Sequence, residues 1–599
     1  MNNKVFSEII DRDWVYSIPG YVFFLYLLLP FRFWEPFVFY NQTESIVISV
    51  FFSGALLLFI LPKVYQTDVF QLTKIDLILL IYSIYLLFRF KYPLEKEIFY
   101  QAFSIVCIYL YFRNLSEKYL RGLLFLLPIA VIVQMLNGIN RFTMPWHNLS
   151  HIGGIFQNTG LFGGFAALGF IVSFGLFLFS DSRNRFIKSI VFLFFGVVLF
   201  LQVYASGSRA SWVAALIAFF FLLYRFILPS LRGALATKQS KIAGYLFASC
   251  LLVTIIFFSN RLYRMKKDSA DGRLLIAKVS LNMAKAAPVF GNGIGGFRAE
   301  YLNYQACYFQ KHPDSPWAYL ADDTETPFDE FLKILIEQGI IGLVLFTLLL
   351  YFLFEKEISE TENQYILQAA ILFILIFGLF SYPFDKFPFS VLFVFSIAGI
   401  AKNRNPVFKL QSRIIRYLRI LIILLFFSIA LPVALNAWDY AKSCRKWNAA
   451  LADFASDREK SLSILKILYH TLNNNPVFLT TYGKTLSFGE YYSEATVVLE
   501  KAVKRLPLST SYIELGNSYD ATGFPEKALD SWNRARRTVP SRFAPAYLSM
   551  KLYFKNKEYD KAREQAEQLL AKKNKIDNPE INTMRQEARD ILNFHPPPR

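Results

Sequence analysis

Charged side chains are scarce in this sequence: Asp, Glu, Lys and Arg make up 18% of its 599 residues, against 54% hydrophobic residues. Soluble globular proteins carry about 25% charged residues, so this balance excludes an ordinary soluble protein and indicates a polytopic membrane protein. The formal net charge is +19. In a soluble domain such a charge would suggest nucleic acid. Here we assign it to loops that orient membrane helices, and we expect no nucleic-acid partner.

Histidine and cysteine are rare, with five and four residues. No Ser/His/Asp spacing typical of a catalytic triad is present, and His147, His151 and His312 lie in loops outside any motif. Two cysteines fall inside apolar runs, which leaves Cys307 and Cys444 as either one disulfide or two free thiols. A cleavage site of small residues is lacking after the first apolar run, so we expect that run to remain as a span.

Long apolar runs, in contrast, recur along most of the chain. They lie near residues 17–34, 45–62, 75–90, 98–113, 121–138, 157–180, 187–205, 210–229, 243–259, 331–354, 366–382, 387–401 and 417–436. A bilayer is crossed by roughly 20 apolar residues, so the sequence predicts an all-α membrane protein with about 12 to 13 transmembrane helices.

Lys and Arg collect in alternate loops, and this bias predicts the orientation. These loops hold Arg113, Lys118 and Arg121; Arg183, Arg185 and Lys188; Arg232, Lys238 and Lys241; and Lys402, Arg404, Lys409, Arg413, Arg416 and Arg419. The positive-inside rule assigns them to the cytoplasm. We therefore expect a multi-pass protein of the bacterial inner membrane with a cytoplasmic N-terminus and a periplasmic C-terminal domain. A helix count wrong by one would reverse the last assignment.

Four polar features then share the outer face of the membrane. They are Gly153–Asn158, Ser206–Arg209, a long loop over residues 260–330, and Thr326–Glu330 at its end. Helix capping by Gly, Ser and Asn would explain each feature separately. A periplasmic binding or catalytic site explains them together.

Arg209 and Arg273 are the residues in these features best suited to hold an anion. A guanidinium presents a rigid fork of donors and pairs with phosphate through two bonds. An ionised side chain at membrane depth is costly, which favours a function over the alternative that both side chains only reach toward head groups. A lipid-linked pyrophosphate fits the pair, and Asn158 and Ser208 are predicted to bind substrate beside it.

A glycine run between Pro288 and Phe297 superficially matches a dinucleotide-binding fingerprint. It lacks the strand–helix–strand context that such a fingerprint requires. Glycine also permits a tight turn, or lets backbone N–H groups approach an anion. We therefore predict that Gly293 and Gly295 bind substrate.

The long loop ends in a cluster of carboxylates. Its members are Asp322, Asp323, Glu325, Asp329 and Glu330. A divalent metal is one alternative. Helix capping is favoured over it, with Thr326 as N-cap, Pro327 at the first helical position and Asp329 completing a capping box. Asp329 and Glu330 are also predicted as catalytic residues, with a general-base role.

The last part of the chain repeats itself. Ala495, Ala528 and Ala562 recur at about 33 to 34 residues, the period of tetratricopeptide repeats. We predict three regions: N-terminal transmembrane helices (1–140), a transmembrane core with the periplasmic loop 260–330 (141–436), and a periplasmic tetratricopeptide-repeat domain (437–599). Such an α-solenoid offers a concave face to a protein partner. A generic helical bundle is the alternative.

In this order the outer-face motifs resemble the O-antigen ligase and polymerase superfamily over roughly residues 140–400. The matching motifs are Gly154-Ile-Phe156-Gln-Asn158, Ser206-Gly-Ser208-Arg209, Gly272-Arg273 with the glycines of 291–295, and Phe328-Asp329 followed by Glu337-x-Gly339 and Gly342. The resemblance implies a GT-C-like fold in the lipid bilayer. It also implies metal-independent, cofactor-free transfer of a glycan from an undecaprenyl-pyrophosphate carrier to a hydroxyl acceptor, with the arginines on the pyrophosphate.

One departure from the family stands at Phe328, where its ligases usually carry the histidine that activates the acceptor. Either Asp329 or Glu330 takes that role, or the group comes from elsewhere, or little base is needed. Three acceptors stay open: the lipid A core (ligase), another glycan (polymerase), and Ser or Thr of a protein. The rival from another class is a transporter of lipid-linked glycan with a scaffold domain. It would need charged residues deep in the spans, where Glu337 is one of few.

Overall fold

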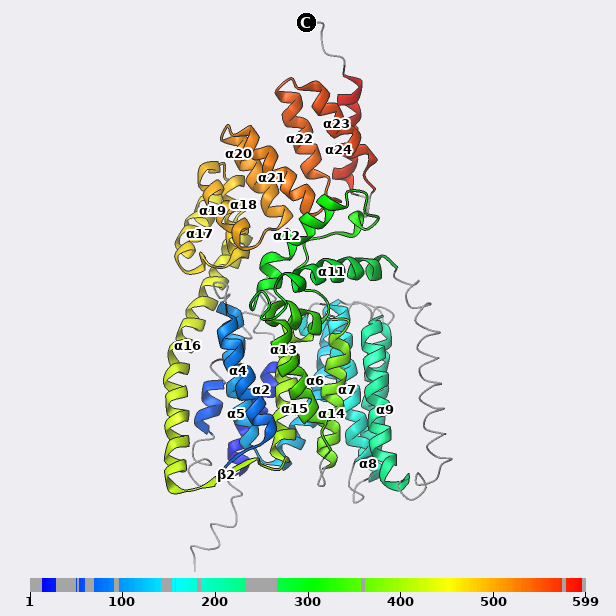
Figure 1. Ribbon diagram of the computed structural model, residues 1–599, viewed down its shortest axis with the longest axis vertical. Coiled ribbons are helices and arrows are strands. Elements are labelled where there is room, and N and C mark those ends of the chain that lie inside the picture. The colour runs from blue at the N-terminus through cyan, green and yellow to red at the C-terminus, as the bar shows by residue number, and fades with distance from the viewer. Residues whose placement is uncertain are drawn as a thin grey trace, which may run out of the picture.

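The structure is a computed structural model, and it describes residues 13–28, 50, 53–59, 69–90, 96–142, 153–156, 158–179, 185–231, 267–356, 361–573 and 578–594. Helices make up nearly all of this part of the chain (Figure 1), which confirms the all-α prediction. The described residues add one small feature that was not predicted. Strand β1 (Val69–Leu72) pairs antiparallel with β2 (Phe408–Gln411), far away in sequence.

A bundle of long apolar helices forms the lower part of the molecule in Figure 1. Its helices are α2 (Asp13–Leu28), α4 (Lys74–Arg89), α5 (Lys96–Asn114), α6 (Glu117–Phe142), α7 (Thr159–Leu178), α8 (Arg185–Ala205), α9 (Arg209–Leu231), α13 (Glu330–Phe354), α14 (Glu362–Gly378), α15 (Phe387–Lys402) and α16 (Arg413–Asp453). Most predicted spans agree with these helices to within a few residues. The predicted span 243–259 and part of 45–62 lie outside the described residues, so the helix count stays a prediction.

The surface of the bundle is apolar, as expected of helices that face lipid. Leu87 and Phe88 at the end of α4 expose 65% and 81% of their area. Within the described residues, five helices are long and apolar enough to cross a membrane. They are Glu117–Leu136, Thr159–Leu178, Arg209–Ile227, Glu330–Phe354 and Tyr417–Asp453. The chain is thus a polytopic membrane protein.

Helix α7 lies inside the bundle and is buried along most of its length. It packs against α6, α8, α9 and α14. Its glycines allow this crowding: a Cβ at Gly164 would stand 2.5 Å from the Phe377 ring of α14. Small residues at helix contacts are the usual means of close packing in membranes. This packing fixes the ends of α7, α9 and α14 relative to one another.

The glycine run lies across a break in α13. Gly339 has φ 67° and ψ −167°, a conformation open essentially to glycine alone, and it divides α13 into two helical segments. The glycine run supplies the hydrogen bonds missing at the break. Gly293 N–H donates to the Glu337 carbonyl at 2.9 Å, and Ile340 N–H donates to the Pro288 carbonyl at 2.9 Å.

Replacing Gly339 by alanine is expected to destabilise this junction by about 3 kcal/mol or more. The new Cβ would impose a disfavoured backbone conformation and clash with the Val289 carbonyl. Gly272→Ala is the matched control, because nothing lies within 4 Å of a Cβ there. Thermal unfolding in detergent checks both variants. A Gly339→Ala protein as stable as wild type would contradict the assignment.

Two helices of the long loop lie between the bundle and the C-terminal domain (Figure 1). They are α11 (Lys267–Ala286) and α12 (Gly296–Lys311), and α11 runs across the end of the bundle. Their buried face includes Val279, Phe297 and Tyr301, which pack with Ile336 of α13. This small core ties the loop to the first segment of α13.

The C-terminal part forms the predicted α-solenoid of paired helices. Its helices are α17 (Arg458–Leu472), α18 (Pro476–Phe488), α19 (Tyr492–Arg505), α20 (Ser509–Ala521), α21 (Pro525–Thr538), α22 (Ala544–Lys555), α23 (Tyr559–Ala571) and α24 (Pro579–Asn593). The repeating residues Ala495, Ala528 and Ala562 are fully buried, which explains the need for small side chains where paired helices meet. Helix α16 continues past residue 437, so the predicted domain boundary falls inside one helix. The tetratricopeptide identity stays a prediction.

The sequence left open whether Cys307 and Cys444 form a disulfide, and the structure answers this question. Cys307 is exposed on α12 and Cys444 is buried in α16, and no disulfide joins the two residues. The disulfide alternative is wrong, because the two residues belong to different packed units of the molecule.

Candidate functional site

The polar features meet at the end of the bundle that faces α11 and the solenoid (Figure 1). The turn between α8 and α9 brings Ser208 and Arg209 there, and Gly207 in this turn has φ 60°. Ser208 Oγ lies 2.6 Å from Ser211 Oγ, and Ser206 Oγ accepts the Ser208 N–H at 3.3 Å. These bonds fix the turn from which Arg209 starts α9.

Asn158 stands at the start of α7, beside the same turn. Its Oδ1 accepts the Leu161 N–H at 3.0 Å, so Asn158 is the N-cap of α7. A Cβ on Gly163 of α7 would collide with Ser206 of the turn. The first turn of α7 and the Ser206–Ser208 turn are thus packed together. The structure gives Asn158 a capping role, and its substrate-binding role stays a prediction.

Arg273 reaches the same place from α11. Its guanidinium lies over the Phe328 ring, 5.3 Å from the centroid. Burial lowers the pKa of Arg273, and the positive charge of nearby Arg209 lowers it further. Among the described residues Arg273 makes no ion pair with a carboxylate. Two like charges held close together at a partly dry site form an arrangement that an anion stabilises.

Phe328 stands where the family pattern leads one to expect histidine, and its backbone is strained. It has φ 57°, a left-handed conformation uncommon for an aromatic residue. The ring of Phe328 meets the ring of Tyr382 edge to face at 5.3 Å. Phe328 therefore contacts both the Arg273 guanidinium and Tyr382, and serves as an apolar wall of the site.

Asp329 is the N-cap of α13. Its Oδ1 accepts the N–H groups of Phe331 at 2.9 Å and Leu332 at 3.0 Å. The prediction of Thr326 as N-cap was wrong, because α13 begins at Glu330. Both hydrogen bonds of this carboxylate within the described part of the chain use Oδ1, and Oδ2 accepts none there. Burial raises the pKa of Asp329 against the opposing effect of both N–H groups.

Glu330 is buried inside the protein. It is 4% exposed, and its Oε1 accepts the Phe384 N–H at 2.8 Å in the link between α14 and α15. One turn further, Lys333 forms an ion pair with Asp385 of the same link. Glu337 accepts the Phe297 N–H at the start of α12. These buried charges hold α12, α13 and the link together, and a catalytic role for Glu330 stays a prediction.

The glycines of the loop are already engaged within the protein. Gly293 N–H is bonded to the Glu337 carbonyl, and Gly295, with φ 78°, is the N-cap of α12. Both positions therefore need glycine for the backbone. Their substrate-binding role stays a prediction.

The remaining acidic residues of the cluster are held by arginines. Glu325 pairs with Arg298 at 2.7 Å, and Asp323 pairs with Arg542 of the solenoid at 2.9 Å. In the part of the chain that the structure describes, no group of three His, Cys, Asp or Glu residues is arranged to hold a metal ion.

Tyr382 and Lys386 were not among the residues predicted for the site. Both come from the short link 379–386 between two apolar helices. Lys386 Nζ lies 5.6 Å from the centroid of the Tyr382 ring, and burial lowers the pKa of Lys386. The signal that could have found them is the run Tyr382-Pro-Phe-Asp385-Lys386, which is polar for a link between two spans.

Fold and site together define a polytopic α-helical membrane protein with an arginine-containing site at one end of its bundle. Residues 194–347 match the family model described as O-antigen ligase, so this part of the chain is similar to the O-antigen ligase superfamily. The matched segment contains Arg209, Arg273, the glycine run and Asp329. A comparison with curated proteins found no match. The family supports a glycan transfer of the ligase or polymerase type that acts on a lipid-linked glycan.

Proposed function

We propose that this protein transfers a glycan from undecaprenyl pyrophosphate to a hydroxyl acceptor at the periplasmic face of the bacterial inner membrane. The observation that carries the proposal is the pair of arginines, in which Arg273 has a lowered pKa and no carboxylate partner among the described residues. Two guanidinium groups together match the charge of a diphosphate.

In the proposed reaction the acceptor oxygen attacks the anomeric carbon of the first sugar with inversion. The bond from that carbon to the pyrophosphate oxygen breaks, and its electron pair leaves with undecaprenyl pyrophosphate. Arg209 and Arg273 stabilise the charge that develops on the leaving group. Lys386, whose Nζ lies over the Tyr382 ring, adds positive charge to the same region.

Asp329 is proposed to take the proton of the acceptor hydroxyl. Its pKa is raised by burial, which makes it a better base than an exposed aspartate. The Oδ1 bonds to Phe331 and Leu332 fix the carboxylate, so Oδ2 is the oxygen for the acceptor. Asn158 and Ser208 would contact substrate at the neighbouring helix ends.

Transfer by the purified protein in detergent tests this function. The assay contains undecaprenyl-pyrophosphate-linked glycan and an acceptor, with and without EDTA. Product formation in both conditions is expected, because the proposed chemistry uses only side chains. A product that disappears with EDTA and returns with added divalent metal would overturn the metal-independent mechanism. A protein that moves the lipid across vesicles without any transfer would support the transporter instead.

The acceptor is resolved by glycan profiling of a deletion strain. Complete polymer that stays on the lipid carrier identifies a ligase, and loss of polymer identifies a polymerase. Loss of glycan from secreted proteins alone identifies a protein transferase.

A further inference from the structure

The solenoid is fastened to the loop that carries the candidate site. Helix α12 packs against α21 of the solenoid. Gln305 of α12 is 1% exposed, and its Nε2 donates to the Thr538 carbonyl at 2.7 Å and to the Asp322 carbonyl at 3.2 Å. Ser541 Oγ donates to the Ala321 carbonyl at 3.3 Å. The segment around 321–323 is therefore held by the solenoid as well as by α12.

The strongest contact between the two parts is made by Asp323, Ser509 and Arg542, which we call the Asp323 clamp. Asp323 Oδ1 accepts the Ser509 N–H at 2.9 Å, and its Oδ2 accepts Ser509 Oγ–H at 2.8 Å. Arg542 Nη2 donates to the same Oδ2 at 2.9 Å, and Arg542 Nε donates to Ser509 Oγ at 2.5 Å. The Asp323 side chain is only 12% exposed.

Two physical effects favour the Asp323 clamp. Ser509 is the first residue of α20, so the carboxylate lies at the positive end of a helix dipole. Its bonds are charge-assisted and largely shielded from water, unlike an exposed ion pair, which contributes little. Removal of either partner would leave a mostly buried charge uncompensated.

The Asp323 clamp lies next to the catalytic segment in sequence and shares its core. Only residues 324–328 connect Asp323 to Asp329, and each residue spans at most about 3.6 Å. Leu508, beside Ser509, packs against the same small core as Phe328. Arg298 holds Glu325 midway at 2.7 Å. A shift of Asp323 therefore moves Phe328 and Asp329 against α11.

We propose that the solenoid is a positioning element for the transfer site, and that the Asp323 clamp sets the pose of Phe328 and Asp329. This inference rests on the proposed function of these residues. The sequence predicts a protein partner for the concave face of the solenoid. We add a second partner within the same chain, the loop 296–325. Transfer then depends on the solenoid even when no other protein is bound.

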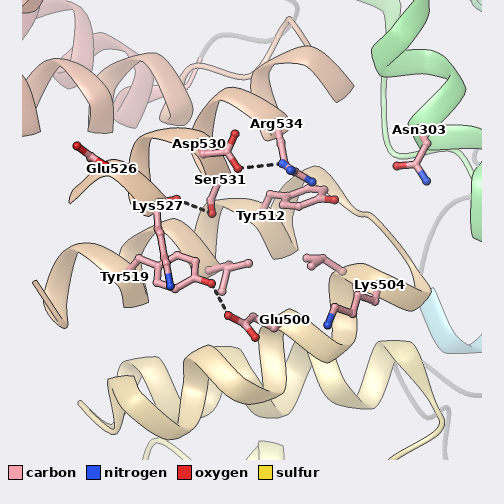
Figure 2. A pocket seen from close by; sticks show the side chains of 12 residues that line it. Asn303, Glu500, Lys504, Tyr512, Tyr519, Glu526, Lys527, Asp530, Ser531 and Arg534 are labelled. Carbon is pink, nitrogen blue, oxygen red and sulfur yellow. Dashed lines mark hydrogen bonds and ion pairs between the residues drawn. The ribbon is translucent and has the colours of Figure 1, made fainter. Parts of the chain in front are cut away.

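A cavity of about 660 Å³ opens between the solenoid and α12 (Figure 2). Tyr512, Tyr519 and Arg534 line it from the solenoid, and Asn303 faces it from α12. Tyr512 lies one turn after Ser509 on α20, and Arg534 lies one turn before Thr538 on α21. The interface held by the clamp therefore also forms one wall of this cavity.

The test compares Arg542→Ala and Arg542→Lys with Lys561→Ala, which removes an exposed ion pair to Glu558 elsewhere in the solenoid. Turnover and KM for the lipid-linked glycan are measured, together with hydrogen exchange of residues 318–329. Misplacement of a reacting group by about 1 Å costs on the order of 100-fold in rate. We expect Arg542→Ala to lower kcat roughly ten- to 100-fold with little change in KM for the lipid-linked glycan, and to speed exchange in 318–329. Arg542→Lys should recover part of both, and Lys561→Ala should match wild type.

The outcomes separate this inference from the proposed function. Faster hydrogen exchange of residues 318–329 in Arg542→Ala, combined with a wild-type kcat, would overturn the positioning role. Unchanged hydrogen exchange in this variant would overturn it as well. The positioning role would also be overturned if Arg542→Ala and Lys561→Ala lost kcat equally and Arg542→Lys did not relieve the loss. Failure of the proposed function shows up separately, as full transfer by Arg273→Ala, and leaves the exchange result for the Asp323 clamp intact.

Discussion

Replacing Arg273 by alanine is expected to lower the rate of glycan transfer by roughly 100- to 1,000-fold, the cost of removing one preorganised donor from a developing charge. Arg273 is partly buried beside Arg209, where a charged bond to the leaving diphosphate counts for more than in water. Its stacking on Phe328 keeps the guanidinium in place before substrate arrives. Single-turnover transfer with purified protein measures the effect.

Two further variants make this result specific to the guanidinium. Arg273→Lys keeps the charge but loses the fork, so it should retain intermediate activity. Lys278→Ala removes a cation from the same helix, one that lies over the Tyr308 and Trp317 rings, and should transfer normally. Equal losses in Arg273→Ala and Lys278→Ala would mean that α11 had been disturbed and that no diphosphate contact had been removed.

The second large effect is expected for Asp329→Asn, which separates capping from catalysis. Asparagine caps helices as well as aspartate does, so α13 should keep its start and its stability. The carboxylate proposed to take the acceptor proton is lost, which should lower kcat roughly 100- to 10,000-fold. Asp329→Ala should in addition lose about 1 kcal/mol of stability with the cap. An Asp329→Asn protein with normal kcat would assign Asp329 to capping alone.

The pH dependence of transfer follows from the same residue. Burial raises the pKa of Asp329 above its ordinary value of 3.8. A base must be ionised to accept a proton, so transfer should be present above the raised pKa and fall as the pH drops through it. A pH–rate profile of kcat should show this acidic limb in wild type. The same limb in Asp329→Asn would assign it to another group.

The membrane helices could be predicted from the sequence because each is a continuous apolar run. The ends of α7, α9 and α15 fall within about two residues of the predicted spans. The same apolar runs predict that Asn158, Arg209 and Asp329 lie at one end of the bundle, since alternate helix ends lie on the same side of a membrane.

Contacts between distant parts of the chain could not be predicted. The sequence of the glycine run is suited to binding an anion, but in the structure it packs against the break in α13 at Gly339. Such close packing of two backbones leaves no periodic pattern in the sequence. The acidic cluster has the same difficulty: Asp323 is bonded to Ser509, 186 residues away. Thr326 and Asp329 are both good N-caps, and only the backbone shows that Asp329 starts the helix.

Tyr382 and Lys386 were missed for a related reason. A short link between two apolar helices usually has only to turn the chain. Its polar residues become informative once α11 places Arg273 beside Tyr382. Burial raises the pKa of Tyr382, so its phenol stays protonated and able to donate a hydrogen bond.

Arg209 and Arg273 are proposed to bind the diphosphate of the lipid carrier together. Native mass spectrometry of the purified protein with undecaprenyl pyrophosphate and with undecaprenyl monophosphate tests this proposal most directly. Wild type is expected to prefer the pyrophosphate, and the Arg209→Ala, Arg273→Ala double variant is expected to lose this preference while still binding the lipid chain. A double variant that keeps the wild-type affinity and preference for the pyrophosphate would contradict it.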